Sequence, residues 1–226
     1  MKHLKLSLSV FISAMLAGIM ISIGGCVYLK LSADGSTLGR IGGALLFSVG
    51  LFTILAFGFH LYTGKVGALF LPGMTYPAKL SELLMTLIGN FAGTFLAGAV
   101  FGRFMTNTTK VASVVEAKLD MLSNNPWRLL AVAAGCGILM FAAVCGFRFA
   151  KNEVVKAVLV LFSVAGFILA GFEHSVADMF YVAASGIVNG KSLGMLGVVV
   201  IGNSIGGALM GLLWRMTKKI QGKEVE

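Results

Sequence analysis

Six apolar stretches, each long enough to cross a lipid bilayer, constrain this chain more than any other feature. A transmembrane helix needs about 20 mostly apolar residues. Only 12% of the 226 residues are charged, against about 25% in soluble domains. The sequence therefore predicts an all-α membrane protein with six transmembrane helices. The six stretches are Leu6–Leu29, Ile41–Leu71, Leu83–Phe104, Trp127–Phe147, Val154–Val188 and Leu193–Trp214.

The first stretch also has a second interpretation. Lys2 and Lys5 precede an apolar run that ends at Ile23-Gly24-Gly25-Cys26, which is similar to a lipoprotein signal cleaved before Cys26. Cleavage would leave five spans and would remove the symmetry between the two halves of the chain.

An internal repeat relates those halves. Gly58-Phe59-His60 and Gly171-Phe172-Glu173 start 113 residues apart, and a Gly-Asn pair follows 31 residues after each first glycine, at Gly89-Asn90 and Gly202-Asn203. Three spans per half give the halves opposite orientations, so we expect two inverted repeats, roughly 1–105 and 126–217, within a single domain over 1–226. Such repeats place a solute site near the membrane midplane, at paired broken helices. The second and fifth stretches are too long for one span and contain polar residues, so these are the helices that we expect to be broken.

The distribution of basic residues predicts the orientation. Six spans place both termini on one side, where ten Lys and Arg residues fall, against seven on the other side. The excess favours cytoplasmic termini in a multi-pass plasma-membrane protein. Because the basic residues sit singly between apolar runs, topology explains the net charge of +9, and we expect no nucleic-acid partner. With Lys65 unassigned, the ten are Lys2, Lys5, Lys79, Arg148, Lys151, Lys156, Arg215, Lys218, Lys219 and Lys223, and the seven are Lys30, Arg40, Arg103, Lys110, Lys118, Arg128 and Lys191.

Two polar clusters fall within the expected broken helices, one over residues 60–65 and one over residues 173–178. Ionisable residues inside a span are costly and by default face a pore or a partner. His174 is the main candidate, because an imidazole with a pKa of about 6.5 can give a passing anion a hydrogen bond or a proton. A buried histidine bonded to a neighbouring helix is the alternative. Asp178 lies one helical turn further on, where it would orient His174 or solvate a helix end.

Lys65 and two asparagines are further candidates. Lys65 would attract anions electrostatically or extend to the membrane surface. Asn90 and Asn203 would hydrogen-bond the loose backbone of the broken helices, or make a simple contact between helices. The glycines beside them, at 89 and 93 and at 202 and 206, fit close packing of helices.

At this point the sequence resembles the formate/nitrite transporter family over nearly its whole length. The most specific element is Gly171-Phe172-Glu173-His174-Ser175-Val176-Ala177-Asp178-Met179-Phe180, which is similar to the family's fifth-helix signature. The order and spacing of four further segments support the resemblance: Phe47-Ser48-Val49-Gly50-Leu51, Leu61-Tyr62-Thr63-Gly64, Gly89-Asn90-Phe91-x-Gly93 and Gly202-Asn203-Ser204-Ile205-Gly206-Gly207.

The resemblance implies an aquaporin-like protomer with its own pore, assembled as a homopentamer in the lipid bilayer. It implies a channel for small monovalent anions, most of all formate, with nitrite or hydrosulfide as alternatives. His174 would be the central histidine, and Thr63 would face it. Phe47, Leu51 and Phe167 would form the outer constriction, and Leu61 and Tyr62 the inner one. Glu173, Lys65, Asn90 and Asn203 complete the expected pore and substrate-binding residues, with no cofactor, no metal and no enzymatic activity.

Four features depart from the family pattern. His60 replaces an acidic residue, Lys65 replaces a small polar one, and Asp178 stands where asparagine is common. The N-terminus is short, so an amphipathic gating segment ahead of the first span is not expected. These departures concern substrate preference and pH gating rather than the fold.

Three other functions are alternatives to an anion channel. A channel for water or another neutral solute would suit the architecture, but the paired Asn-Pro-Ala motifs are missing, and the one Asn-Pro is Asn125-Pro126 in a predicted loop. A membrane enzyme or metal site would use Glu173, His174 and Asp178, whereas metal sites need three or four ligands and an ordered second shell. The third alternative is a subunit with no role in transport.

Overall fold

Helices form almost all of the chain that the structure describes. The computed structural model describes residues 2–71, 76–102, 104 and 108–222, and within these ranges it contains no strand. The predicted all-α class is confirmed. In chain order the elements are α1 (Lys2–Leu31), η1 (Ser32–Asp34), α2 (Thr37–Phe57), α3 (Tyr62–Val66), η2 (Gly67–Phe70), α4 (Tyr76–Ala97), the π-helical turn η3 (Gly98–Gly102), α6 (Thr108–Asn124), α7 (Pro126–Phe149), α8 (Glu153–Leu169), α9 (Ser175–Ser185) and α10 (Gly190–Ile220).

Five helical segments among the described residues are long and apolar enough to cross a membrane: Ser7–Asp34, Thr37–Phe57, Ala78–Gly102, Pro126–Phe149 and Gly190–Ile220. The fifth predicted stretch, Val154–Val188, instead forms two shorter helices, α8 with 17 residues and α9 with 11. A count of six crossings therefore depends on taking α8 and α9 as the two parts of one broken span.

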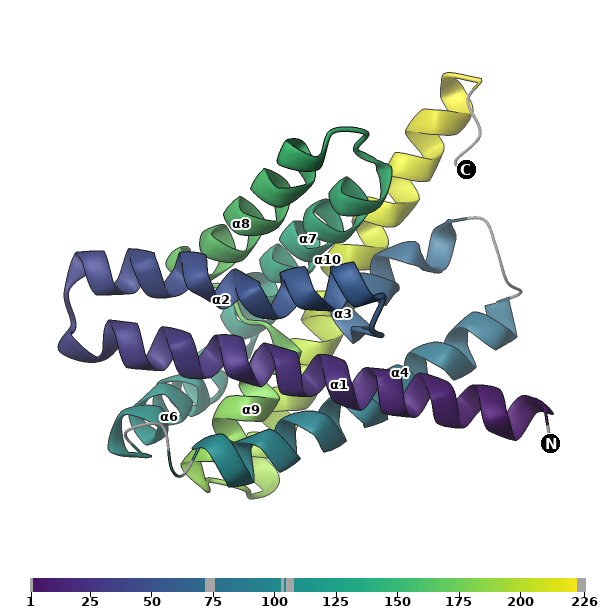
Figure 1. Ribbon diagram of the computed structural model, residues 1–226. Coiled ribbons are helices and arrows are strands. Elements are labelled where there is room, and N and C mark those ends of the chain that lie inside the picture. The colour runs from purple at the N-terminus through teal and green to yellow at the C-terminus, as the bar shows by residue number, and fades with distance from the viewer. Residues whose placement is uncertain (1, 72–75, 103, 105–107, 223–226) are drawn as a thin grey trace.

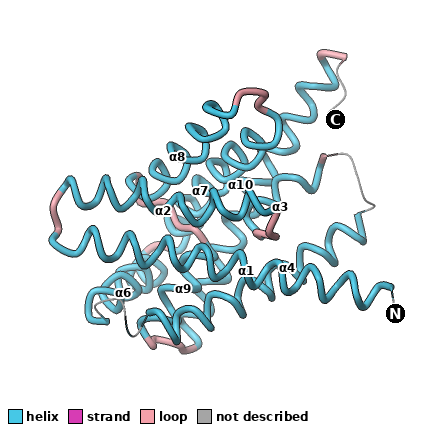
Figure 2. Tube along the Cα trace, in the orientation of Figure 1, coloured by secondary structure: helices cyan, strands magenta, loops and turns pink. Residues whose placement is uncertain are grey.

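Both predicted breaks are present, and each begins at a glycine. Gly58, with φ of +69°, ends α2, and Gly171, with φ of +71°, follows the end of α8. Glycine adopts this left-handed conformation without a steric penalty. The N–H of the next residue then bonds a carbonyl of the helix just ended, Phe59 to Ile54 and Phe172 to Phe167, both at 2.9 Å. The chain leaves the helix in the same way in both halves (Figure 2).

Glycine contacts hold the first and third helices of each half together. A Cβ built on Gly93 of α4 would lie 2.1 Å from the carbonyl oxygen of Met15 in α1. A Cβ on Gly206 of α10 would lie 2.0 Å from that of Ala134 in α7. Neither site has room for a side chain, so α1 with α4, and α7 with α10, approach backbone to backbone as the glycine pattern predicted.

The two halves interlock through the short helices that follow the breaks. The segment α3–η2 of the first half packs against α10 of the second half, and α9 of the second half packs against α4 and η3 of the first. The long helices α2 and α8 also contact each other. The breaks therefore meet in the interior, surrounded by helices from both halves (Figure 1).

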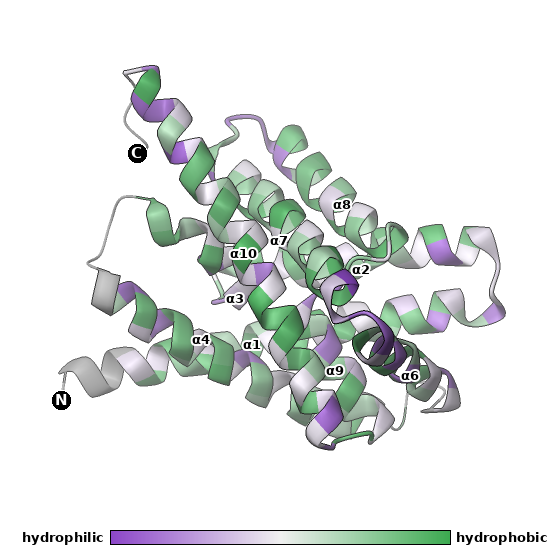
Figure 3. Cartoon of the chain, turned by 180° about the vertical axis from the view of Figure 1, so that it is seen from behind, coloured by the Kyte–Doolittle hydropathy of each residue, from purple (hydrophilic) through white to green (hydrophobic). Residues whose placement is uncertain are grey.

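Different elements lie at the two ends of the helix bundle. The start of α1 and the end of α10 lie on the right in Figure 1, and the α1–α2 turn and α6 lie on the left. Hydrophobic residues cover most helices, whereas hydrophilic residues gather at turns and at the last turns of α10 (Figure 3). No helix was predicted between the stretches that end at Phe104 and begin at Trp127, but residues 108–124 form α6, whose buried residues include Val111, Val115 and Lys118. Arg103 and Lys223, which entered the charge comparison, lie outside the described residues.

Candidate functional site

One asparagine holds the break of the first half. Asn90 of α4 donates from Nδ2 to the carbonyl oxygens of Ala14, at 2.8 Å, and His60, at 2.9 Å. Its Oδ1 accepts a hydrogen bond from the backbone N–H of Tyr62 at 2.8 Å. These bonds satisfy backbone groups that the non-helical segment leaves without helical partners, which buried backbone requires.

Asn203 of α10 does the same for the second break. Its Nδ2 donates to the carbonyl oxygens of Ala133 and Glu173, and its Oδ1 accepts from the N–H of Ser175, all at 2.8 Å. These bonds match those of Asn90 one for one. His60 and Glu173 are therefore equivalent positions of the two repeats.

His174 links the two breaks. It caps the N-terminus of α9, where its Nδ1 accepts a hydrogen bond from the backbone N–H of Ala177 at 3.1 Å. Its Nε2 lies 3.0 Å from Oγ1 of Thr63, in α3 of the other half. A nitrogen that accepts carries no proton, so these bonds fit a neutral ring with its proton on Nε2, donating to Thr63. The side chain is 2% exposed.

Aromatic rings cover one face of His174. Phe167 of α8 stacks on the imidazole with ring centroids 5.5 Å apart, and Phe47 of α2 meets Phe167 edge-on at 5.9 Å. Both phenylalanines are buried. Of the residues expected in the outer constriction, Phe167 therefore contacts the histidine directly, and Phe47 contacts Phe167.

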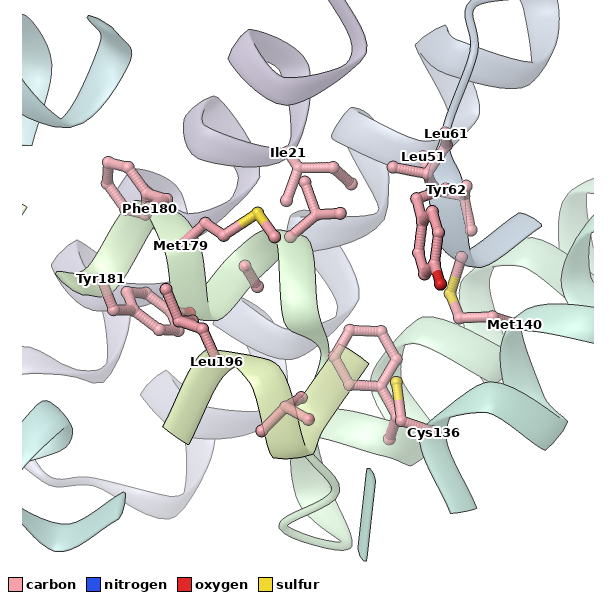
Figure 4. Close-up of a cluster of buried hydrophobic side chains, with 14 of the residues drawn as sticks. Ile21, Leu51, Leu61, Tyr62, Cys136, Met140, Met179, Phe180, Tyr181 and Leu196 are labelled. Atoms are coloured by element: carbon pink, nitrogen blue, oxygen red, sulfur yellow. The ribbon is translucent and has the colours of Figure 1, made fainter. Parts of the chain in front are cut away.

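Leu51, Leu61 and Tyr62 belong to the buried cluster drawn in Figure 4. The hydroxyl of Tyr62 lies 2.8 Å from Oγ of Ser204 in α10, so a residue of the other half positions this ring. Leu61 is the residue just before α3. Leu61 and Tyr62, expected in the inner constriction, thus adjoin Thr63, and Leu51, expected in the outer one, is buried in the same cluster.

A cavity of about 150 Å³ reaches His174 from the side of α6. We call it the Lys118 pocket, and Phe167, Glu173, Asp178 and Tyr181 are among its lining residues. The pocket brings an apolar ring, the candidate histidine and three charged side chains to one small space.

Lys118 of α6 binds both carboxylates of this pocket. Its Nζ donates to Glu173 and lies 3.0 Å from Oδ1 of Asp178. Burial alone lowers the pKa of Lys118, but Asp178 and Glu173 raise it by more, so the pKa lies above its ordinary value and the amine keeps its proton. The carboxylate of Asp178 therefore pairs with Lys118, and its backbone N–H bonds the carbonyl oxygen of His174 at 2.9 Å. Two buried oxygens here, Asp178 Oδ2 and Ser175 Oγ, have no hydrogen-bond partner among the described residues.

A second group of charges lies at the other break. His60 Nε2 is 3.2 Å from Oε1 of Glu82 in α4, and Lys65 Nζ contacts the same oxygen. We call His60, Lys65 and Glu82 the His60 cluster. Ser13 of α1 completes its surroundings, since its hydroxyl lies 2.9 Å from Nδ1 of His60. Lys65 is therefore neither a free cation nor a side chain that simply extends into solvent.

The sequence predicted the candidate residues better than their charged partners. The structure brings His174 and Thr63 together, places Phe47 and Phe167 beside them, and sets Asn90 and Asn203 under the breaks. Lys118 and Glu82 were missed, because they lie far along the chain from the residues they bind and outside both polar clusters. In the part of the chain that the structure describes, no group of three or more His, Cys, Asp or Glu is placed to hold a metal ion.

Comparison with known families gives a match over most of the chain. The model of the family described as Formate/nitrite transporter matches residues 1–216. The chain is 29% identical over 234 residues to the Uncharacterized transporter YrhG of Bacillus subtilis, covering 95% of this chain and 87% of that protein. It is 28% identical over 218 residues to the Formate channel BtFdhC of Bacillus thuringiensis, covering 88% and 83%.

Two solved structures share the fold. A pentameric formate channel with formate bound superposes with a TM-score of 0.81 at 23% identity, covering 96% of this chain and 98% of that one. A second structure, an FNT family ion channel, has a TM-score of 0.83 at 22% identity and covers 93% and 90%. At these identities the likeness establishes the arrangement of helices.

Proposed function

Because this chain belongs to the formate/nitrite transporter family, we propose that it passes formate, or a similar small monovalent anion, through a pore in each subunit. Family membership makes the chain a multi-pass membrane transporter of anions and not an enzyme. The relatives named as formate channels favour formate over nitrite and hydrosulfide.

The observation that carries the proposal is the contact between His174 and Thr63, 3.0 Å apart. It joins the two breaks in the interior, where inverted repeats place their solute site. A passing carboxylate would accept one hydrogen bond from the Nε2–H of His174 and another from the hydroxyl group of Thr63. Two donors in place of a hydration shell lower the cost of moving an anion through an apolar region.

The neutral state of His174 shapes the mechanism. A proton on Nδ1 would point at the N–H of Ala177, which now donates to that nitrogen. A cation at the first turn of α9 would also oppose the positive end of the helix dipole. Hydrogen bonding by the neutral ring is therefore favoured over a permanent positive charge. Proton transfer from His174 to an anion would first require a second proton on Nδ1, so the ring would have to leave its capping position.

Assembly and orientation complete the proposal. The chain would form a homopentamer in the plasma membrane, with both termini in the cytoplasm. A structural neighbour that is itself a pentameric formate channel supports the assembly. The excess of basic residues on the side of the termini supports the orientation. Residues 1–226 would form one channel domain, with inverted repeats at roughly 1–105 and 126–217.

The test is initial uptake by proteoliposomes of formate, nitrite, hydrosulfide, acetate and lactate, each at about pH 5.5 and about pH 7.5. Water permeability is measured on the same vesicles. We expect formate to enter fastest and the larger carboxylates more slowly. Water flux without anion uptake would instead identify a neutral-solute channel, and uptake equal to that of empty liposomes would reject transport.

A further inference from the structure

The His60 cluster combines two nitrogen bases with one carboxylate at the edge of the interior. A single oxygen, Oε1 of Glu82, contacts both His60 and Lys65. The side chains of His60, Lys65 and Glu82 are 25%, 30% and 19% exposed. The group is thus partly open to solvent, unlike the Lys118 pocket, whose three charged residues are buried.

The two breaks differ in their ratio of acidic to basic side chains. At the break of the second half, the two carboxylates of Glu173 and Asp178 surround one base, Lys118. In the His60 cluster one carboxylate faces two bases. The cluster has no net charge when His60 is neutral and a charge of +1 when His60 is protonated.

No other charged side chain that the structure describes is bonded to the cluster. From α1, Ser13 presents an uncharged hydroxyl to His60. From α4, Lys79 lies one turn before Glu82 and bonds the carbonyl oxygens of Leu69 and Leu71. Asn90 bonds the backbone of His60, not its ring.

The carboxylate of Glu82 is the same chemical group as the head of a small carboxylate anion. A site that holds this group with an ammonium and an imidazole can hold a free carboxylate in the same way. We propose that the His60 cluster is an anion-capture site at one mouth of the pore, in which Glu82 is a tethered occupant that an incoming carboxylate displaces. Protonation of His60 strengthens capture, because two cations then share one carboxylate. This inference rests on the proposed function.

The position of the cluster connects it to the pore. In the sequence, His60 and Lys65 flank a segment that contains Leu61, Tyr62 and Thr63. Thr63 in turn contacts His174. Asn90 fixes both the carbonyl of His60 and the N–H of Tyr62. An anion held by His60 and Lys65 is therefore next to the apolar residues it must pass before it meets Thr63.

The decisive variant is Glu82→Gln, which removes the tethered carboxylate and keeps its shape. We expect the formate concentration at half-maximal uptake to fall about two- to fivefold, the range for loss of a partly exposed ion pair. Glu153→Gln is the matched control. Glu153 forms an exposed pair with Lys156 on α8, so the same chemical change there leaves that concentration unaltered.

His60→Gln and Lys65→Gln test the two cations. In the wild type, capture strengthens as the pH falls and His60 gains its proton, so half-maximal uptake needs less formate at about pH 4.5 than at about pH 7.5. His60→Gln should lose this difference. Lys65→Gln should raise the concentration at both pH values. Protonation of formate itself is common to all variants and cancels in the comparison.

A binding measurement separates this inference from the proposed function. Line broadening of ¹³C-formate by the purified, detergent-solubilised full chain reports binding whether or not the protein conducts. Tighter binding to Glu82→Gln, lost again in Glu82→Gln/Lys65→Gln, supports the capture site. Equal binding by wild type, Glu82→Gln and His60→Gln overturns it, even if uptake is robust. Absence of uptake by the wild type rejects only the proposed function. Size-exclusion elution at the wild-type volume shows that each variant is folded.

Discussion

At the scale of single residues, His174 does two jobs that can be separated. Its Nδ1 caps α9, and its Nε2 bonds Thr63. His174→Ala removes both, whereas asparagine is itself a good capping residue, so His174→Asn keeps the cap and loses the bond from Nε2. We expect both variants to lower formate flux at every pH tested, because each removes the Nε2–H that donates to the anion. Only His174→Ala should also lose about 1 kcal/mol of stability from the missing cap.

Flux measured between about pH 5 and pH 8, together with thermal unfolding in detergent, checks this prediction. Flux that stays unchanged in His174→Asn across that range would show that the imidazole neither donates to the anion nor switches its charge. Equal stability of the two variants would show that the cap contributes nothing.

The sequence predicted the site residues that the internal repeat relates to one another, but it did not predict their ion-pair partners. The equivalence of His60 with Glu173 follows from the 113-residue period, and the bonds of Asn90 and Asn203 confirm it. Glu82 has no acidic counterpart 113 residues on, where Met195 stands, and Lys118 lies between the two repeats. Their partners lie 17 and 55 residues away, and only the packing of α4 and α6 brings them close. Lys118 was predicted to be a loop lysine that sets the topology, whereas the structure shows a buried cation.

At the scale of elements, the breaks depend on Asn90 and Asn203. Replacing either with alanine leaves two carbonyl groups and one N–H without their partner in a buried region. An unsatisfied buried group costs about 1–3 kcal/mol, and neighbouring groups recover part of that, so we expect a loss of about 2–4 kcal/mol for each. Because the two asparagines make the same three bonds, the losses should be similar.

Thr94→Val is the control for this prediction. Thr94 lies one turn after Asn90 and is also buried, but its hydroxyl bonds only carbonyls of its own helix, those of Asn90 and Phe91. Such bonds contribute little to helix stability, so the loss should stay below about 1 kcal/mol. Unfolding in detergent measures all three variants. A loss for Asn203→Ala no greater than that for Thr94→Val would mean that the amide does not hold the break.

Helix packing gives a second prediction at this scale. Gly206→Ala places a Cβ 2.0 Å from the carbonyl oxygen of Ala134, so α7 and α10 must separate, at a cost of about 1–3 kcal/mol. Gly197, nine residues earlier on α10, has nothing within 4 Å of a Cβ. Gly197→Ala should be neutral or stabilise by up to about 1 kcal/mol, because alanine is the better helix former. Equal effects of the two substitutions on unfolding would contradict the close contact.

The sequence predicted those helices and breaks that have a distinctive local composition. Length and hydropathy placed the long helices, and glycine beside polar residues placed the two breaks. The same reasoning failed for α6, because a helix of alternating polar and apolar residues resembles a loop in a hydropathy profile. Val111 and Val115 are buried on one face of α6, and that helical periodicity was the signal that could have found it.

At the scale of the whole molecule, neither half can form the site by itself. Thr63 comes from the first half and His174 from the second. The short helix of each half packs against the third helix of the other half. The repeats are therefore one folding unit with one interior, and this interior is complete within a single chain. A pore made by one chain should work regardless of its neighbours in an oligomer.

Mixed oligomers test that independence. Thr63→Phe puts a ring where Oγ1 now lies 3.0 Å from His174, and we expect a subunit with this substitution to conduct no formate. Wild-type and blocked subunits are co-expressed at several ratios, and oligomers of each composition are reconstituted at equal total protein. If each subunit has its own pore, formate uptake falls in proportion to the fraction of blocked subunits. If the chain is a pentamer in which one blocked subunit closes the pathways of all its neighbours, uptake follows the fifth power of the wild-type fraction. At equal amounts of the two subunits these outcomes differ by more than about tenfold, so a steep fall would show that the pathways of neighbouring subunits are not independent.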